Sequence, residues 1–102
     1  MALFKRKEVL TETDGGATLW AVEGVIELTP TALVLHGINR FQGAVTIPLR
    51  NIATMHAKTA TESGGMGHPV LEITTNDGSS YARRSRYDAY ADLVRFVELA
   101  TS

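Results

Sequence analysis

The spacing of apolar residues changes near the C-terminal end of this chain, from a strand-like to a helical period. Over residues 17–84 the apolar residues form short stretches that Gly, Pro, Asn and Asp interrupt, a pattern typical of short strands joined by turns. Over residues 87–100 they recur every three or four positions, which predicts one amphipathic helix. We therefore expect a mainly β fold, a small barrel of six to seven antiparallel strands with the helix 87–100 packed across it.

Length, charge and cysteine content exclude several classes of protein. The 102 residues suffice for one domain with a single core, in which 1–16 is an N-terminal segment and 17–100 the core. A formal net charge of −1 provides no overall positive field, so we expect no nucleic-acid partner. The absence of cysteine excludes a disulfide scaffold, a thiolate zinc site and a cysteine nucleophile.

The N-terminal segment bears on localisation. Lys5, Arg6 and Lys7 place charge where a signal peptide needs an apolar run. The apolar stretches of the chain are also far shorter than the about 20 residues that span a bilayer. We expect an uncleaved cytoplasmic protein, which is either fully soluble or peripheral to a membrane.

Six strand-like segments can be delimited in the core. They cover residues 17–28, 32–36, 44–49, 52–59, 70–74 and 79–84. Gly24 divides the first segment, so a seventh strand arises either there, by a bend, or before it within residues 7–13. Pro48 predicts a sheet edge or a strand end, because proline lacks a backbone N–H. Asn76, Asp77 and Gly78 predict a hairpin turn between the last two segments.

The helical segment has a predicted start and a predicted buried face. Ser85 is placed to cap the helix, with Asp88 three residues on, where a carboxylate suits the exposed amides. The apolar residues then follow one stripe, which we expect to pack on the strands. The stripe consists of Ala89, Leu93, Phe96, Val97 and Ala100.

Three sequence motifs, in this order, resemble the pleckstrin-homology-like superfold in its bacterial PH and GRAM-type versions. The motifs are Gly-Val-Ile-Glu-Leu-Thr at 24–29 followed by Ala-Leu-Val-Leu at 32–35, Ile-Pro-Leu-Arg-Asn-Ile at 47–52, and Leu-Glu-Ile-Thr-Thr-Asn-Asp-Gly at 71–78. Asn51 stands where the pattern usually has Asp. The resemblance covers about residues 17–100 and implies seven strands, a terminal helix, and a scaffold that binds lipids, peptides or protein partners.

The resemblance also indicates which of these ligands to expect. Eukaryotic members bind phosphoinositides through basic residues in the loop between their first two strands. Here Glu23, Glu27 and Pro30 occupy the nearest positions, without Lys or Arg. A protein partner is therefore favoured over a lipid headgroup.

Six residues are candidates for binding. Arg83, Arg84 and Arg86 form the densest basic cluster, either an anion site at the helix start or solvated charges at a strand end. Strand alternation would send Arg83 and Arg84 to opposite faces. Arg40 and Phe41 lie in a predicted loop and could contact a partner or a membrane. Met66 lies in the irregular stretch 60–69, as a soft apolar anchor or as part of a plain connection.

The polar residues form no pattern typical of a catalytic or metal-binding site. His36, His56 and His68 lack a ligand spacing, although His36 and His56 could meet across strands. Ser, Thr and Asp residues occur in no nucleophile elbow or triad-like setting. We expect no enzymatic activity, no cofactor and no bound metal.

Two functional hypotheses follow. The first is a protein-interaction or assembly module, which would accept a partner strand, or self-associate, at an exposed edge or in the groove between the fifth segment (70–74) and the helix. The alternative is a peripheral domain that binds anionic lipid through residues 5–7, Arg40, Phe41 and the basic residues within 83–86. A small-ligand binder or enzyme is a weaker third possibility.

Overall fold

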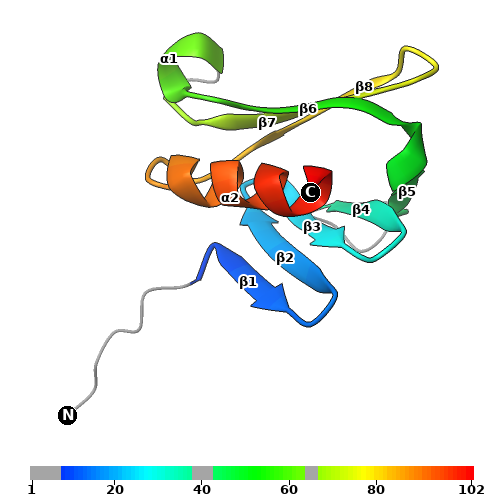
Figure 1. Cartoon of the computed structure of the whole chain (residues 1–102). Coiled ribbons are helices and arrows are strands. Elements are labelled where there is room, and N and C mark those ends of the chain that lie inside the picture. The colour runs from blue at the N-terminus through cyan, green and yellow to red at the C-terminus, as the bar shows by residue number, and fades with distance from the viewer. Residues whose placement is uncertain (1–7, 38–42, 64–66) are drawn as a thin grey trace.

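The computed structural model describes residues 8–37, 43–63 and 67–102. Within them the chain forms strands that lie in two antiparallel sheets, and a C-terminal helix (Figure 1). The strands are β1 (Leu10–Thr13), β2 (Gly16–Ala21), β3 (Gly24–Leu28), β4 (Ala32–Gly37), β5 (Val45–Pro48), β6 (Ile52–Lys58), β7 (Val70–Thr75) and β8 (Ser80–Arg84). The helices are η1 (Leu49–Asn51), α1 (Ala60–Ser63) and α2 (Tyr90–Thr101).

The described strands number eight, against six to seven expected, because both possibilities left open at the N-terminal side are realised. A strand, β1, precedes residue 17, and the segment 17–28 divides into β2 and β3. The division falls at Gly24, whose φ of +139° suits glycine alone, and a Cβ there would collide with the carbonyl oxygen of His36.

The strands form two sheets in place of the expected closed barrel. Sheet order is β1-β2-β3-β4-β5 in one and β6-β7-β8 in the other. The sheets are connected at one corner by η1, which leads from β5 into β6. At another corner the Val22 N–H, in the turn between β2 and β3, donates to Arg84 O at 2.8 Å.

Helix α2 packs between the sheets and closes the core. The predicted stripe is confirmed, since Ala89, Leu93 and Phe96 are fully buried and Val97 and Ala100 pack beside them. The helix contacts β6 and β2, one strand from each sheet. It therefore supplies the apolar surface that two short sheets cannot provide for each other.

The predicted start of α2 is wrong. The helix begins at Tyr90, and its N-cap residue, Ala89, makes no side-chain capping bond. Ser85 instead continues the β7–β8 ladder, where its N–H donates to Pro69 O at 2.8 Å and its side chain is buried. Strand pairing thus extends one residue past β8 and leaves Ser85 unable to cap.

Local turn chemistry otherwise follows the sequence. Gly78 has a φ of +89° in the β7–β8 turn, and the Asp77 carboxylate accepts hydrogen bonds from the Thr75 hydroxyl and the Ser79 N–H. Helix α1 had not been expected. It begins with a capping box in which Thr59 and Glu62 exchange side-chain-to-backbone hydrogen bonds.

Pro48 lies at the end of β5 and at the edge of its sheet, as predicted. Among the described residues, no helix has the length and apolar character to cross a bilayer.

Candidate functional site

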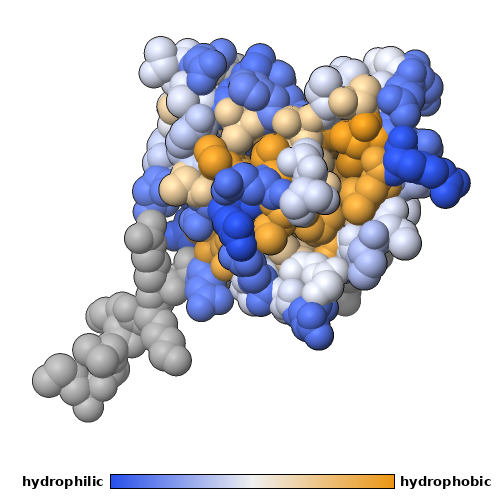
Figure 2. Space-filling model, in the orientation of Figure 1, coloured by the Kyte–Doolittle hydropathy of each residue, from blue (hydrophilic) through white to orange (hydrophobic). Residues whose placement is uncertain are grey.

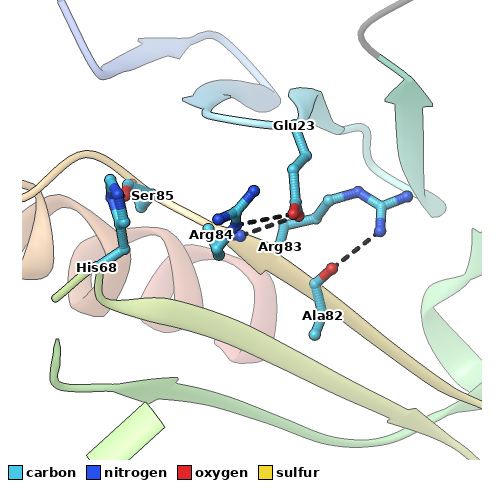
Figure 3. A network of polar contacts seen from close by, with 6 residues as sticks. All are labelled: Glu23, His68, Ala82, Arg83, Arg84 and Ser85. Carbon is cyan, nitrogen blue, oxygen red and sulfur yellow. Dashed lines mark hydrogen bonds and ion pairs between the residues drawn. The ribbon is translucent and has the colours of Figure 1, made fainter. Parts of the chain in front are cut away.

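The arginines of the predicted basic cluster do not converge (Figure 3). Arg84 donates from Nε to Glu23 Oε1 at 2.9 Å and from its backbone N–H to Glu23 Oε2 at 3.2 Å. Arg83 folds back along the strand, where its Nη1 donates to Ala82 O at 2.9 Å. The two side chains diverge, as strand alternation predicted, and Arg84 is paired with a carboxylate.

Two stacked rings stabilise the position of the link between β8 and α2. Rings of His68 and Tyr87 stack with centroids 4.1 Å apart, and His68 Nδ1 lies 2.8 Å from Ser85 O. Because a carbonyl oxygen only accepts, Nδ1 carries the proton in this contact. Arg86 lies in the same link, whose position is thus set by packing around His68.

The histidines lie apart. His36 Nε2 is 3.0 Å from Glu27 Oε1 on the five-stranded sheet. His56 belongs to β6 in the other sheet, so the hypothesis that His36 and His56 meet across strands is wrong. Within the described residues no three His, Asp or Glu side chains are grouped to hold a metal ion.

Three of the predicted binding residues, Arg40, Phe41 and Met66, lie outside the described residues. Their proposed contacts with a partner or a membrane stay predictions.

A polar cleft of about 280 Å³ separates β5 from the β7–β8 turn. Its walls include Thr75, Asn76 and Asp77, whose polar groups are already engaged. Asn76 Nδ2 donates to Arg50 O at 3.0 Å, and Asp77 is bound by Thr75 and Ser79 as described above. Polar side chains of Thr46, Asn51 and Tyr81 complete the walls of this cleft.

A second hollow, of about 370 Å³, lies between the first half of β6 and the last turn of α2. We call it the helix-end groove. Its lining residues are Leu49, Ile52, Ala53, Thr54, Met55, Ala100, Thr101 and Ser102. A neighbouring hollow of about 310 Å³ shares three of them and reaches the β1–β2 and β3–β4 turns. Figure 2 shows hydrophobic side chains gathered on this face around the C-terminal end of α2.

The helix-end groove borders a strand edge that no described strand pairs with. Asn76 N–H donates to Asn51 O, so alternate residues of β7 back to Glu72 direct their backbone toward β6. Their register partners on β6, such as His56, face β7 in turn. The N–H and C=O of Met55 must then point away from the sheet, along the edge beside the groove.

The location of this groove corrects one prediction. A binding groove was expected between the segment 70–74 and the helix, whereas this groove lies beside β6, the edge strand of the same sheet. The neighbour of α2 is β6. The lining comes from Leu49, from residues 52–55 and from residues 100–102, and no spacing in the sequence relates these segments.

Comparisons with protein-family models, with curated proteins and with solved structures find no match.

Proposed function

We propose that this protein is a non-catalytic interaction or assembly module of PH-like, GRAM-type character, which binds an extended segment of a protein partner in the helix-end groove. The observation that carries the proposal is the backbone edge at Met55, which has no partner among the described residues and lies beside a hollow lined by apolar and small polar side chains. An extended peptide can add to such an edge through main-chain hydrogen bonds, while its alternate side chains enter the hollow.

The order of elements supports the PH-like part of the proposal. Strands β2 to β5 and then β6 to β8 make seven strands in two antiparallel sheets, and α2 follows them. The resemblance implies this same count and order. β1 is an addition at the edge of the first sheet.

The electrostatics favour a peptide over a lipid headgroup. The turn between β2 and β3 carries Glu23, and its carboxylate neutralises Arg84. An anionic headgroup at this turn would have to displace that pair. The groove itself is lined by apolar and small polar side chains without a charge.

A peptide-display selection on the purified protein tests the proposal. We expect enriched peptides with alternating apolar residues, and amide shifts in NMR titrations concentrated at 52–55 and 100–102. Ala100→Glu, which places a charge in the groove, should weaken binding at least tenfold. Glu98→Ala, on the exposed face of α2, serves as the matched control and should bind as the wild type does.

Three outcomes contradict the proposal. They are a selection without enrichment, binding that Ala100→Glu leaves unchanged while the variant keeps its circular dichroism spectrum, and amide shifts away from the groove. Co-sedimentation with vesicles, with and without phosphatidylserine, tests the membrane alternative, which requires binding that depends on the anionic lipid and falls with salt.

A further inference from the structure

The polar cleft joins three segments that are distant in sequence. β5, η1 and the hairpin of β7 and β8 meet there, and Figure 1 shows β5 and the β7–β8 turn on the same side of the molecule. The cleft shares no lining residue with the helix-end groove. Its volume of about 280 Å³ is below the about 300–1,000 Å³ of drug-sized ligand pockets, so it suits a small molecule or a single side chain.

The cleft carries a negative charge. Asp77 is the one charged side chain among the described residues that line it. Arg50 precedes this wall in η1, but the described residues form no ion pair with Asp77. Arg83 lies on the same face of β8 as Tyr81, yet it donates to Ala82 O and is not part of the lining.

The Asp77 carboxylate is held in place and can still accept hydrogen bonds. The Thr75 hydroxyl and the Ser79 N–H both donate to Oδ1, and the Ser79 hydroxyl adds a third contact. A carboxylate has about four acceptor positions, so at least one remains for a ligand. Because the group is already ordered by the turn, little freedom is lost when a ligand binds.

The other polar walls supply further acceptors. The Thr46 hydroxyl, the Asn51 amide and the Tyr81 hydroxyl have no partner among the described residues. The Asn76 amide donates from Nδ2 to Arg50 O, which leaves its Oδ1 as an acceptor. The Tyr81 ring adds an aromatic face of the kind that attracts cations.

We propose that the polar cleft binds the charged end of an alkyl guanidinium, with Asp77 as its counter-ion. A guanidinium has five N–H donors and no acceptor, and its plane stacks on aromatic rings, which matches an acceptor-rich cleft beside Tyr81. The buried Ile47 and the half-buried Pro48 provide an apolar wall for the alkyl stem. The carboxylate repels anions, and a neutral molecule gains nothing from its charge.

Titration with butylguanidinium, followed by NMR of the backbone amides, tests the proposal. We expect saturable shifts concentrated at residues 46–51 and 75–81, which weaken as salt is added. Butylurea has nearly the same shape and hydrogen-bonding groups but no charge. It should bind about tenfold more weakly or worse, because hydrogen bonds to a charged group are stronger than those between neutral groups.

Three variants separate the charge of the cleft from its shape. Asp77→Asn keeps an acceptor for Thr75 and Ser79 but removes the charge, and should weaken butylguanidinium binding about tenfold or more. Tyr81→Phe removes a single hydroxyl and should weaken it about threefold. Asp14→Asn is the matched control, since Asp14 is an exposed aspartate in the β1–β2 turn, and it should bind as the wild type does. Circular dichroism checks that each variant is folded.

The guanidinium has two possible sources, a free compound or an arginine side chain of a protein partner. Acetyl-arginine-methylamide that binds more tightly than butylguanidinium supports the site with an arginine side chain as its ligand, and weaker binding supports it with a free compound. The proposal is overturned by an absence of saturable shifts, by shifts confined to other regions, by equal binding of butylurea, or by a folded Asp77→Asn variant with unchanged affinity. None of these results bears on peptide binding at residues 52–55 and 100–102, which is measured separately.

Discussion

Glu23 and Arg84 lie 61 residues apart in the chain and join the two sheets at one corner. The Glu23 carboxylate, in the β2–β3 turn, accepts from both the guanidinium and the backbone N–H of Arg84. The neighbouring Val22 N–H binds Arg84 O. The last residue of β8 is thereby fully bonded, and the turn that separates β2 from β3 is held against the second sheet.

The Glu23→Ala variant should lose about 1 kcal/mol of unfolding free energy in urea denaturation. Partly exposed ion pairs contribute little, but here a backbone N–H also loses its acceptor. Glu98→Ala, at an exposed position on α2, should change stability by less than about 0.5 kcal/mol. Equal effects of the two substitutions would show that the contact between Glu23 and Arg84 contributes no measurable stability.

Gly24→Ala should destabilise the protein by at least about 2 kcal/mol more than Gly78→Ala. Both glycines have a positive φ, but a Cβ at Gly24 would collide with the backbone of β4, whereas that at Gly78 points into open space. Thermal and urea unfolding of the two variants measure the difference. Similar losses would mean that β4 yields to the added methyl group.

The Asp77 carboxylate should make stability depend on pH in the acid range. Hydrogen bonds from the Thr75 hydroxyl, and then from Ser79, lower the pKa of Asp77 below its ordinary 3.8. A lowered native pKa stabilises the fold above the unfolded value, and this contribution is lost as pH falls through the native pKa. The stability difference between the wild type and Asp77→Asn should therefore shrink below about pH 4.

Thr75→Val provides the check on this mechanism. Removing the hydroxyl that contributes most should raise the pKa of Asp77 toward 3.8 in an NMR titration of the carboxyl carbon. An unchanged pKa in this variant would contradict the assigned cause.

Much of the fold was predictable because its signals are local. The hairpin at Asp77 and Gly78, the edge position of Pro48 and the buried stripe around Phe96 each follow from a few neighbouring residues. Local signals were ambiguous where strand pairing with a distant segment decided between two structures for the same residue. Ser85 can cap a helix or extend a ladder, and the carbonyl of Pro69, which is distant in sequence, selects the ladder.

The candidate sites were less predictable than the fold. Three basic residues within four positions look like one cluster in the sequence, yet Arg83 turns to its own strand and Arg84 to Glu23. Conversely, the helix-end groove unites Met55 with Ala100, which no sequence spacing relates.

The sequence by itself determined the kind and approximate bounds of most strands and of the C-terminal helix, and the face that this helix buries, because turn chemistry and apolar period act over a few residues. Tertiary structure decided which strands became edges, which edges were covered, and which charges found partners. These outcomes depend on contacts between distant segments, such as Glu12 with Arg95 and Glu23 with Arg84. The groove beside α2 exists only once the second sheet and the helix are packed together.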